Sequence, residues 1–307
     1  YGNSDLTVDN NILSDYTRDG IGVNGGASGN PDVFISNNTL NGSAIPLNAI
    51  SLIDDATGSI VNNTIKDHSR SAPWAGCGIL VNSDSILVDS NDVQNCYQGI
   101  DLIGSISGIT VSNNYLAGII DHGFVLSSVS NSTLKSNVFE NADTAINAAV
   151  LLNNGSTGNV IGGLGFGNSF TLPTTGTGNL RGITMPNDLA SGSNTISYND
   201  FAGGTRQIQI DGGNSGATDI LYNTFNGGER HIQVDGGVTG TYKIYNNTIG
   251  NVTSPTFGAI IMNGGSATIT NNNIKNGVRP MEFSGVTSLD INNNIIDGSD
   301  YDGINLG

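Results

Sequence analysis

The fold is evident from residues 86–140, which read ILVDSNDVQNCYQGIDLIGSISGITVSNNYLAGIIDHGFVLSSVSNSTLKSNVFE. The pattern apolar-x-x-Asn-x-apolar occurs here three times, around Asn91, Asn114 and Asn137, at a spacing of 23 residues. A polar turn follows the first two copies and leads to a second apolar run, which starts at Gly99 or Gly123. Short alternating apolar runs between Asn and Gly residues are typical of short β-strands.

The same six-residue pattern, with one degenerate copy, extends along the whole chain. Its asparagines are Asn11, Asn38, Asn63, Asn91, Asn114, Asn137, Asn168, Asn199, Asn223, Asn247, Asn272 and Asn294, so the spacing averages about 26 residues. A unit of this length cannot bury an apolar face alone, but stacked units can. We therefore expect twelve coils stacked roughly 4.8 Å apart in parallel register, with aliphatic residues inside. The repeated Asn side chains are expected to form a polar ladder along the stack.

The spacing between each Asn copy and the following Gly-Ile-x-Leu run resembles the repeats of a known fold. Examples of that run are Gly20–Val23, Gly78–Val81 and Gly99–Leu102. The chain resembles, over its whole length, the right-handed parallel β-helix of the pectate-lyase-like superfamily. The resemblance implies an all-β solenoid of about twelve coils, forming one domain over residues 1–307. It does not select a function, because the fold serves lyases, hydrolases, epimerases, tailspikes, adhesins and surface fibres.

Composition narrows the function classes. The 44 glycines and 43 asparagines exceed a quarter of the 307 residues and argue against helices. The formal net charge is −16, with 10 Lys and Arg against 26 Asp and Glu, which excludes a non-specific nucleic-acid binder. No apolar run approaches the length of a membrane span, so we expect no membrane insertion. Acidity, few lysines and many Asn, Gly, Thr and Ser residues favour an extracellular or cell-surface protein.

One column of aligned positions is rich in arginine. The residues two positions before the second apolar run are Asp19, Asn48, Cys77, Gln98, His122, Thr144, Arg181, Arg206, Arg230, Gly258, Arg279 and Asp302. Stacked arginines repel one another unless a negative group lies beside them. Two interpretations are open. The arginines bind an anionic partner such as an acidic polysaccharide, since Arg grips carboxylates bidentately, or they pair internally with Glu229, Asp211 or Asp235.

A second constellation has the residue types of acid–base catalysis. Asp121 and His122 are expected near Tyr97 and Arg70 on neighbouring coils, and Trp74 is expected to stack on a sugar ring. Further members are Asp101 and His68. A uronate lyase or C5-epimerase needs a base for the proton beside the uronate carboxyl and a group that neutralises that carboxyl. The complete motifs of alginate epimerases and polygalacturonases are absent from the sequence, and scattered polar turn residues are the alternative interpretation.

The sequence leaves two questions open, namely whether the chain binds a metal ion and whether its two cysteines form a disulfide. No cofactor is expected. Asp297, Asp300 and Asp302 place oxygen ligands at short spacing, as Ca²⁺ prefers, but turn-forming Asp residues are the alternative. Cys77 and Cys96 lie on adjacent coils, either as a disulfide that staples the long turn over residues 66–77 or as two buried free thiols.

The first and last coils carry similar sequences and have no obvious capping helix. Asn10–Tyr16 and Asp19–Ile21 resemble Asn293–Ile296 and Ser299–Ile304. An open coil end invites pairing with another strand. The leading hypothesis is therefore a secreted structural protein that self-associates end to end into a filament, sheath or surface layer, with the chain a segment of a longer array or a unit that stacks. The alternatives are a polysaccharide-active enzyme and a tailspike-like glycan-binding module.

Overall fold

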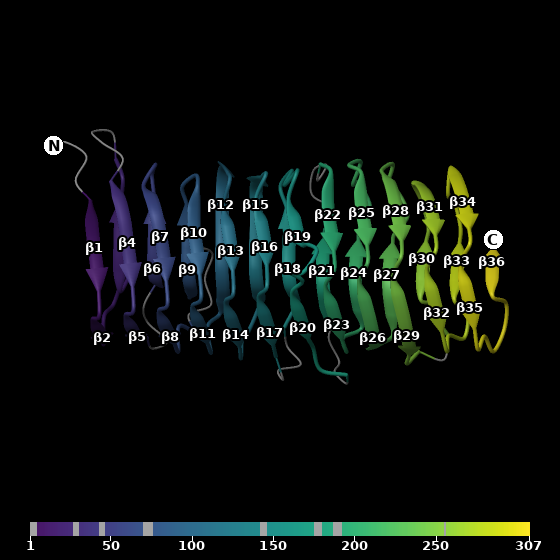
Figure 1. Ribbon diagram of the computed structural model, residues 1–307, viewed down its shortest axis with the longest axis horizontal. Coiled ribbons are helices and arrows are strands. Elements are labelled where there is room, and N and C mark those ends of the chain that lie inside the picture. The colour runs from purple at the N-terminus through teal and green to yellow at the C-terminus, as the bar shows by residue number, and fades with distance from the viewer. Residues whose placement is uncertain are drawn as a thin grey trace.

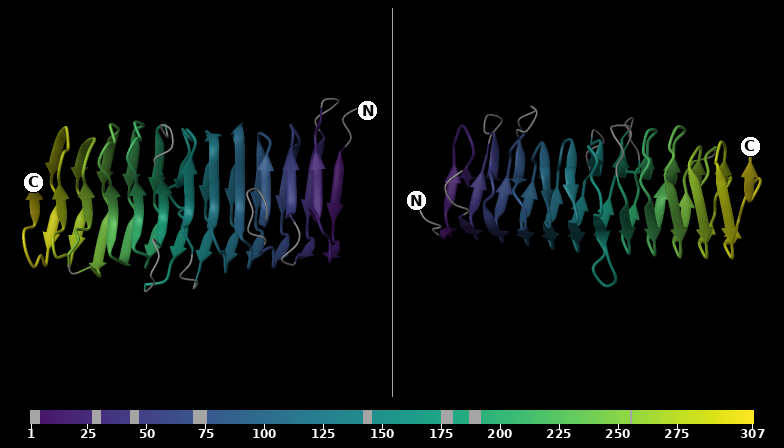
Figure 2. Two further views of the ribbon diagram at one scale, coloured as in Figure 1. Left: turned by 180° about the vertical axis from the view of Figure 1, so that it is seen from behind. Right: turned by 90° about the horizontal axis from the view of Figure 1, so that it is seen from above.

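The computed structural model confirms the parallel β-helix. It describes residues 5–26, 31–42, 47–69, 76–141, 146–174, 180–186, 192–254 and 256–307. Within these ranges the chain forms three parallel sheets of twelve strands each, and every strand pairs with its equivalents on the adjacent coils. The coils stack into a rod with the two ends of the chain at opposite tips (Figures 1 and 2). None of the described segments forms a helix of the length and hydrophobicity that a membrane crossing requires.

Each coil contributes one strand to each sheet. Sheet A contains β1 (Leu6–Asp9), β4 (Asp32–Ser36), β7 (Thr57–Val61), β10 (Ile86–Asp89), β13 (Thr110–Ser112), β16 (Thr133–Lys135), β19 (Val160–Gly162), β22 (Asn194–Ser197), β25 (Thr218–Leu221), β28 (Thr241–Tyr245), β31 (Ser266–Thr270) and β34 (Ser288–Asn292). Sheet B contains β2 (Ile12–Ser14), β5 (Thr39–Asn41), β8 (Thr64–Lys66), β11 (Asp92–Gln94), β14 (Tyr115–Ala117), β17 (Val138–Glu140), β20 (Ser169–Thr171), β23 (Asp200–Ala202), β26 (Thr224–Gly228), β29 (Thr248–Val252), β32 (Asn273–Lys275) and β35 (Ile295–Asp297). Sheet C contains β3 (Ile21–Asn24), β6 (Asn48–Ile53), β9 (Cys77–Asn82), β12 (Gln98–Ser107), β15 (His122–Ser130), β18 (Ala148–Asn153), β21 (Arg181–Met185), β24 (Arg206–Ile210), β27 (Arg230–Val234), β30 (Ile260–Met262), β33 (Met281–Phe283) and β36 (Ile304–Leu306).

The asparagine ladder runs without interruption from the first coil to the last. Each ladder Asn donates its side-chain amide to the Oδ1 of the ladder Asn on the next coil, from Asn11 to Asn294, over 2.8–3.1 Å. Asn168, in the degenerate copy of the pattern, also belongs to it. The ladder therefore lines the tight turn between sheets A and B, as the sequence predicts.

The left-handed backbone of this turn lies one residue before the ladder Asn. In eleven coils that residue has a φ of 53–60°: Asn10, Asn37, Asn62, Ser90, Asn113, Ser136, Tyr198, Tyr222, Asn246, Asn271 and Asn293. Asn adopts this conformation more readily than most residues because its short polar side chain bonds locally. The tyrosines at two of these positions are exceptional.

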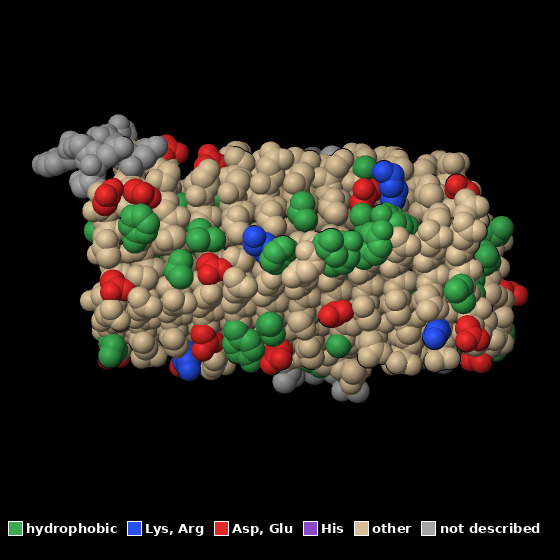
Figure 3. Space-filling view, viewed as in Figure 1, with side chains coloured by type: hydrophobic (Ala, Val, Ile, Leu, Met, Phe, Trp, Pro, Cys, Tyr) green, Lys and Arg blue, Asp and Glu red, His purple; other side chains and the backbone are tan. Residues whose placement is uncertain are grey.

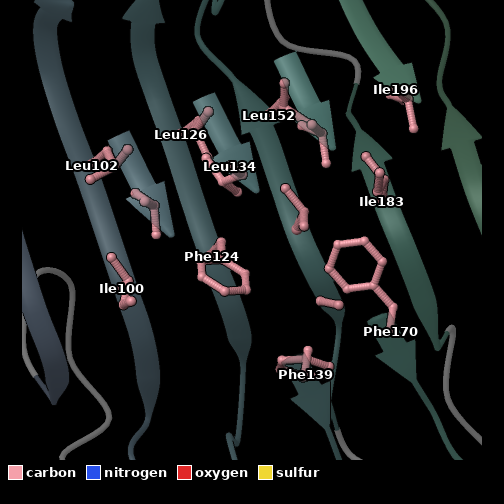
Figure 4. Close-up of a cluster of buried hydrophobic side chains, with 14 of the residues drawn as sticks. Ile100, Leu102, Phe124, Leu126, Leu134, Phe139, Leu152, Phe170, Ile183 and Ile196 are labelled. Carbon is pink, nitrogen blue, oxygen red and sulfur yellow. The ribbon is translucent and has the colours of Figure 1, made fainter. Parts of the chain in front are cut away.

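The core is a continuous column of aliphatic and aromatic side chains inside the coils. Figure 4 shows part of it, with Phe124, Phe139 and Phe170 packed among Ile and Leu residues of neighbouring strands. Phe170, Phe201 and Phe225 stack from coil to coil with ring centroids 5.1 and 5.0 Å apart. Because inward and outward positions alternate along each strand, the polar side chains between these core residues face outward.

Candidate functional site

The described part of the arginine column and the Asp121–His122 pair lie on the outer side of sheet C, and a glycine lies beside each row position in most coils. Gln98 pairs with His122 and Ile100 with Phe124 in one register, with Gly99 and Gly123 between these pairs. A Cβ atom at Gly123 would lie 2.5 Å from the Phe139 side chain. Only glycine fits this close approach to the core, which explains why a glycine precedes the core residues of so many sheet C strands.

His122 and Asp121 form a close pair at the start of β15. Nδ1 of His122 lies 2.9 Å from Oδ2 of Asp121, and the two side chains are 15% and 17% exposed. Asn147 on the next coil also donates to Asp121. Burial alone would raise the pKa of Asp121, but the contacts with His122 and Asn147 outweigh it and hold the pKa below its usual value. An ionised carboxylate therefore lies beside the imidazole, in the place of a group that orients a general base.

A buried carboxyl group lies one coil away, at Asp101 on β12. Its Oδ2 accepts a hydrogen bond from the Cys77 thiol over 3.2 Å, and neither side chain is exposed. Burial raises the pKa of Asp101 to about 7, against the thiol hydrogen bond and with a further contribution from the negative charge of Asp121. Burial also raises the pKa of Cys77 well above its usual value, so Cys77 remains a thiol. This site therefore holds an acid whose proton is exchangeable near neutral pH.

The arginine column is confirmed in register. Arg181 pairs with Arg206, and Arg206 pairs with Arg230. Arg279 precedes Met281 by two residues, and Met281 pairs with Ile260 of the preceding coil, which places Arg279 in the same column. The sixth member differs from the prediction. Ala148 lies between His122 and Arg181, whereas Thr144 lies outside the described residues.

The arginines are held by glutamines, which the sequence interpretation did not include. Nε of Arg181 donates to Oε1 of Gln209 over 2.5 Å, and Nε of Arg206 donates to Oε1 of Gln233 over 2.9 Å. Nη1 of Arg230 donates to the same Gln233 oxygen over 2.6 Å. In the described part of the chain, no carboxylate lies within ion-pair distance of Arg181 or Arg230.

Two carboxylates complete this network beyond the glutamines. Gln209 donates to Oδ1 of Asp211 over 2.5 Å and to Oδ2 of Asp235 over 3.2 Å, and Gln233 also donates to Asp235. Burial and the neighbouring Asp235 carboxyl raise the pKa of Asp211, against the opposite effects of Arg181 and Gln209. The predicted internal pairing with Asp211 and Asp235 thus runs through glutamine side chains, which leaves guanidinium charge along the face.

Aromatic rings cover the arginines near the C-terminal end of the column. The Arg230 guanidinium lies 3.4 Å from the centroid of the Phe257 ring. Arg279 lies 3.6 Å from Glu282 and 5.7 Å from the Tyr301 ring centroid. Arg279 therefore has a direct carboxylate partner, and it is a weaker candidate for binding an anion than Arg181.

The other predicted residues have mixed placements. Tyr97 is half-buried on the coil beside Asp121, whose backbone N–H donates to the Tyr97 carbonyl over 2.8 Å. Arg70 and Trp74 lie outside the described residues. His68 contacts Tyr97 through its backbone, since its carbonyl accepts from the Tyr97 N–H over 2.7 Å, but its side chain is buried and its Nε2 lies 2.5 Å from the Tyr16 hydroxyl.

The cysteine and metal candidates are also placed. Cys77 and Cys96 are both buried free thiols, so the second of the two cysteine interpretations is the observed one. Asp297, Asp300 and Asp302 are exposed in the last coil. Within the described ranges, no three His, Cys, Asp or Glu side chains are grouped as a metal site requires.

Comparison with known proteins agrees with this architecture. Residues 1–163 match the model of a family described as right handed beta helix region. The chain belongs to this family. No curated protein matches the chain.

Solved structures with the same fold include polysaccharide-active enzymes. The catalytic domain of a GH87 alpha-1,3-glucanase in complex with nigerose has a TM-score of 0.54 and 12% identity, covering 98% of this chain. An alginate lyase from Paenibacillus sp. str. FPU-7 has a TM-score of 0.51 and 12% identity, covering 85% of this chain and 92% of its own. The periplasmic alginate epimerase AlgG has a TM-score of 0.50 and 15% identity, covering 87% and 69%. The chain spans 63% of the glucanase domain, and at these identities the likeness shows the fold alone.

Proposed function

We propose that this β-helix binds and processes a polyuronate along the outer side of sheet C, as a lyase or C5-epimerase. The observation that carries the proposal is the row His122, Ala148 and Arg181 on three consecutive coils. A candidate base and a candidate carboxylate-binding group are thereby separated by two strand spacings, roughly 10 Å, with the buried Ala148 in the row between them.

Both reactions begin with the same proton transfer. His122, oriented by Asp121, takes the proton from C5 of the uronate, while Arg181 neutralises the charge that develops on the adjacent carboxylate. In a lyase, the C4–O4 bond then breaks, a C4–C5 double bond forms, and the departing oxygen takes up a proton. In an epimerase, a proton returns to C5 from the opposite face. Tyr97 is the candidate donor for either step.

The known neighbours support this choice of substrate class. Their names include an alginate lyase and an alginate epimerase, and these share the fold over most of this chain. The epimerase is named as periplasmic, and the composition of this chain also suits a location outside the cytoplasm. We therefore include an extracellular or periplasmic location in the proposal.

The test is incubation of the purified protein with alginate and with polygalacturonate. Absorbance of the unsaturated uronate reports a lyase, and proton NMR of the epimer ratio reports an epimerase. Loss of activity in Arg181→Gln, with activity retained in the exposed control Lys275→Gln, is the expected result. No product from either polymer would reject the enzyme, whereas binding without product would identify a glycan-binding module.

End-to-end assembly remains a second candidate because of the first and last coils. Large aliphatic side chains are exposed there, with Ile12 82%, Ile295 62% and Leu306 69% exposed. Burial of such side chains against the next unit would favour a filament. Sedimentation velocity and electron microscopy at increasing concentration test this proposal, and a single compact species throughout would reject it.

A further inference from the structure

A stripe of aromatic side chains lies on the face formed by sheets A and B, away from the candidate active site. Figure 3 views this face and shows apolar side chains gathered over β22, β25 and β28. The stripe consists of Phe166, Tyr198, Tyr222 and Tyr245, which follow one another on consecutive coils. Phe166 is 55% exposed and Tyr222 is 39% exposed.

The rings form an ordered platform. Tyr198 and Tyr222 stack with centroids 4.8 Å apart and an interplanar angle of 8°. Tyr245 meets Tyr222 edge-on at 5.1 Å, and its hydroxyl lies 3.1 Å from that of Tyr222. An aromatic group thus recurs at each coil, with apolar ring surface next to hydroxyl groups.

The backbone beneath this platform is unfavourable for tyrosine. Tyr198 and Tyr222 have φ values of 60° and 56°, at a turn position where most other coils have Asn or Ser. A bulky residue in the left-handed region is a genuine outlier, and such strain clusters at functional sites. Stacking between the rings offsets part of the strain, but it does not explain why rings stand at this exposed position.

Positive charge lies at both ends of the stripe, although the whole chain carries −16. Nζ of Lys135 lies 5.3 Å from the Phe166 ring centroid. Lys243 precedes Tyr245 by two residues on β28, so both side chains face outward, and the Lys243 side chain is 62% exposed with Asp219 3.9 Å away. A hollow of about 340 Å³ adjoins it, lined by Gly158, Ser193, Asn194, Thr195, Ala217, Asp219 and Lys243.

We propose that this stripe is a second glycan-binding surface, for a polysaccharide that carries carboxylate groups. Its pyranose rings pack along the exposed side of the Tyr198–Tyr222 stack, and its hydroxyl groups bond the tyrosine hydroxyls, because tyrosine combines an apolar ring with a polar tip. Its carboxylates meet Lys243 and Lys135, which give charge complementarity on an otherwise acidic protein. The surface is separate from sheet C and binds polymer whether or not sheet C is catalytic.

The residues at the same turn position in other coils indicate which substitutions can test the proposal. Tyr198→Asn and Tyr222→Asn place in these coils the residue that Asn246 and Asn271 provide at the same φ, so the fold is retained. Phe34→Ala is the matched control, an aromatic residue 41% exposed on sheet A of the second coil. In affinity electrophoresis through alginate, each Tyr→Asn change should weaken retention by about tenfold, and Phe34→Ala should not.

Further variants and a second polysaccharide distinguish this surface from the sheet C site and from a dimer interface. Lys243→Gln should weaken retention by alginate, and a neutral glucan should retain the parent much less than alginate does. Arg181→Gln, on sheet C, should leave the tyrosine-dependent part of the retention intact, so the result does not depend on enzyme activity. Unchanged retention of a folded variant that carries both Tyr198→Asn and Tyr222→Asn would overturn the proposal. So would a parent dimer that the Tyr222→Asn change converts to monomer, because the stripe would then bind a second copy.

Discussion

The Cys77 sulfur lies 3.2 Å from Oδ2 of Asp101, and both side chains are fully buried although Asp101 occupies an outward position of sheet C. Ile100 and Leu102 on either side of it point into the core. A buried carboxyl group without a cationic partner favours its neutral form. The pair therefore places a protonatable acid on the coil next to Asp121, whose charge contributes to the raised pKa of Asp101.

Asp101 should make stability depend on pH. Its pKa of about 7 lies above the usual value of 3.8, so the folded state holds a proton that the unfolded state has lost. Asp101 alone should therefore lower the free energy of unfolding as pH rises from about 4 to 7, by at most about 4 kcal/mol. The buried His68 and His231, whose pKa burial lowers to about 4, act in the opposite direction, so the contribution of Asp101 is the difference between two pH profiles. In urea unfolding, Asp101→Asn should remove this contribution, whereas the exposed-site control Asp300→Asn should keep it. Parallel pH profiles of the parent and Asp101→Asn would contradict the prediction.

The asparagine ladder should be most sensitive in its buried part. Asn114 is 1% exposed, donates to Asn137 over 3.0 Å and accepts from both the backbone and the side chain of Asn91 over 2.9 Å. Asn114→Ala should cost about 3 kcal/mol, because several buried groups lose their partners. Asn11, exposed at the end of the ladder, should cost less than about 1 kcal/mol when changed to Ala. Equal losses in chemical denaturation would show that burial does not govern the ladder.

The ladder was fully predictable because its residues repeat at a nearly constant distance from the core positions. Each Asn sits between two inward-facing apolar residues, so alignment of the apolar pattern also aligned the asparagines, including Asn168 in its degenerate copy. The rows of sheet C follow a turn whose length differs between coils. Their positions can therefore be aligned in the sequence only by the residue next to the row. That residue is glycine at Gly99 and Gly123 but alanine at Ala149, which explains why Thr144 was assigned to the row that Ala148 occupies.

The chemistry of the site was less accessible from the sequence. The column placed Arg181 beside Arg206, but it did not show that Gln209 and Gln233 separate the guanidinium groups from the carboxylates. That arrangement depends on contacts between the arginine row of one coil and the glutamine row of the next coil. The burial of Asp101 was equally hidden, because its outward position predicts exposure. The signals for these features in the sequence are the duplicated IQIDGG and IQVDGG segments and the polar residues at outward positions next to His122.

The pKa of Asp211 should depend on the neighbouring Asp235 carboxyl group. Burial raises the pKa of Asp211, and the nearby Asp235 raises it further. Asp235→Asn should therefore move the pKa of Asp211 downward, since the like charge is removed while Arg181 remains. Carbon-13 NMR of the side-chain carboxyl measures this shift, with Asp219→Asn as a control on another sheet. An upward or absent shift would mean that Asp235 does not act on Asp211 through its charge.

The kinetics of variants at His122, Asp121 and Arg181 should distinguish base catalysis from substrate binding. If His122 removes the uronate proton, His122→Gln should lower kcat by at least about 100-fold with little change in KM, since a general base acts in the transition state. Asp121→Asn should lower kcat less, because the imidazole remains but loses the carboxylate that orients it. Arg181→Lys should raise KM and also lower kcat, because a point charge replaces a bidentate grip on the carboxylate both in the bound substrate and in the transition state. If all three variants changed kcat and KM by the same factors, the row would have a structural role and not a catalytic one.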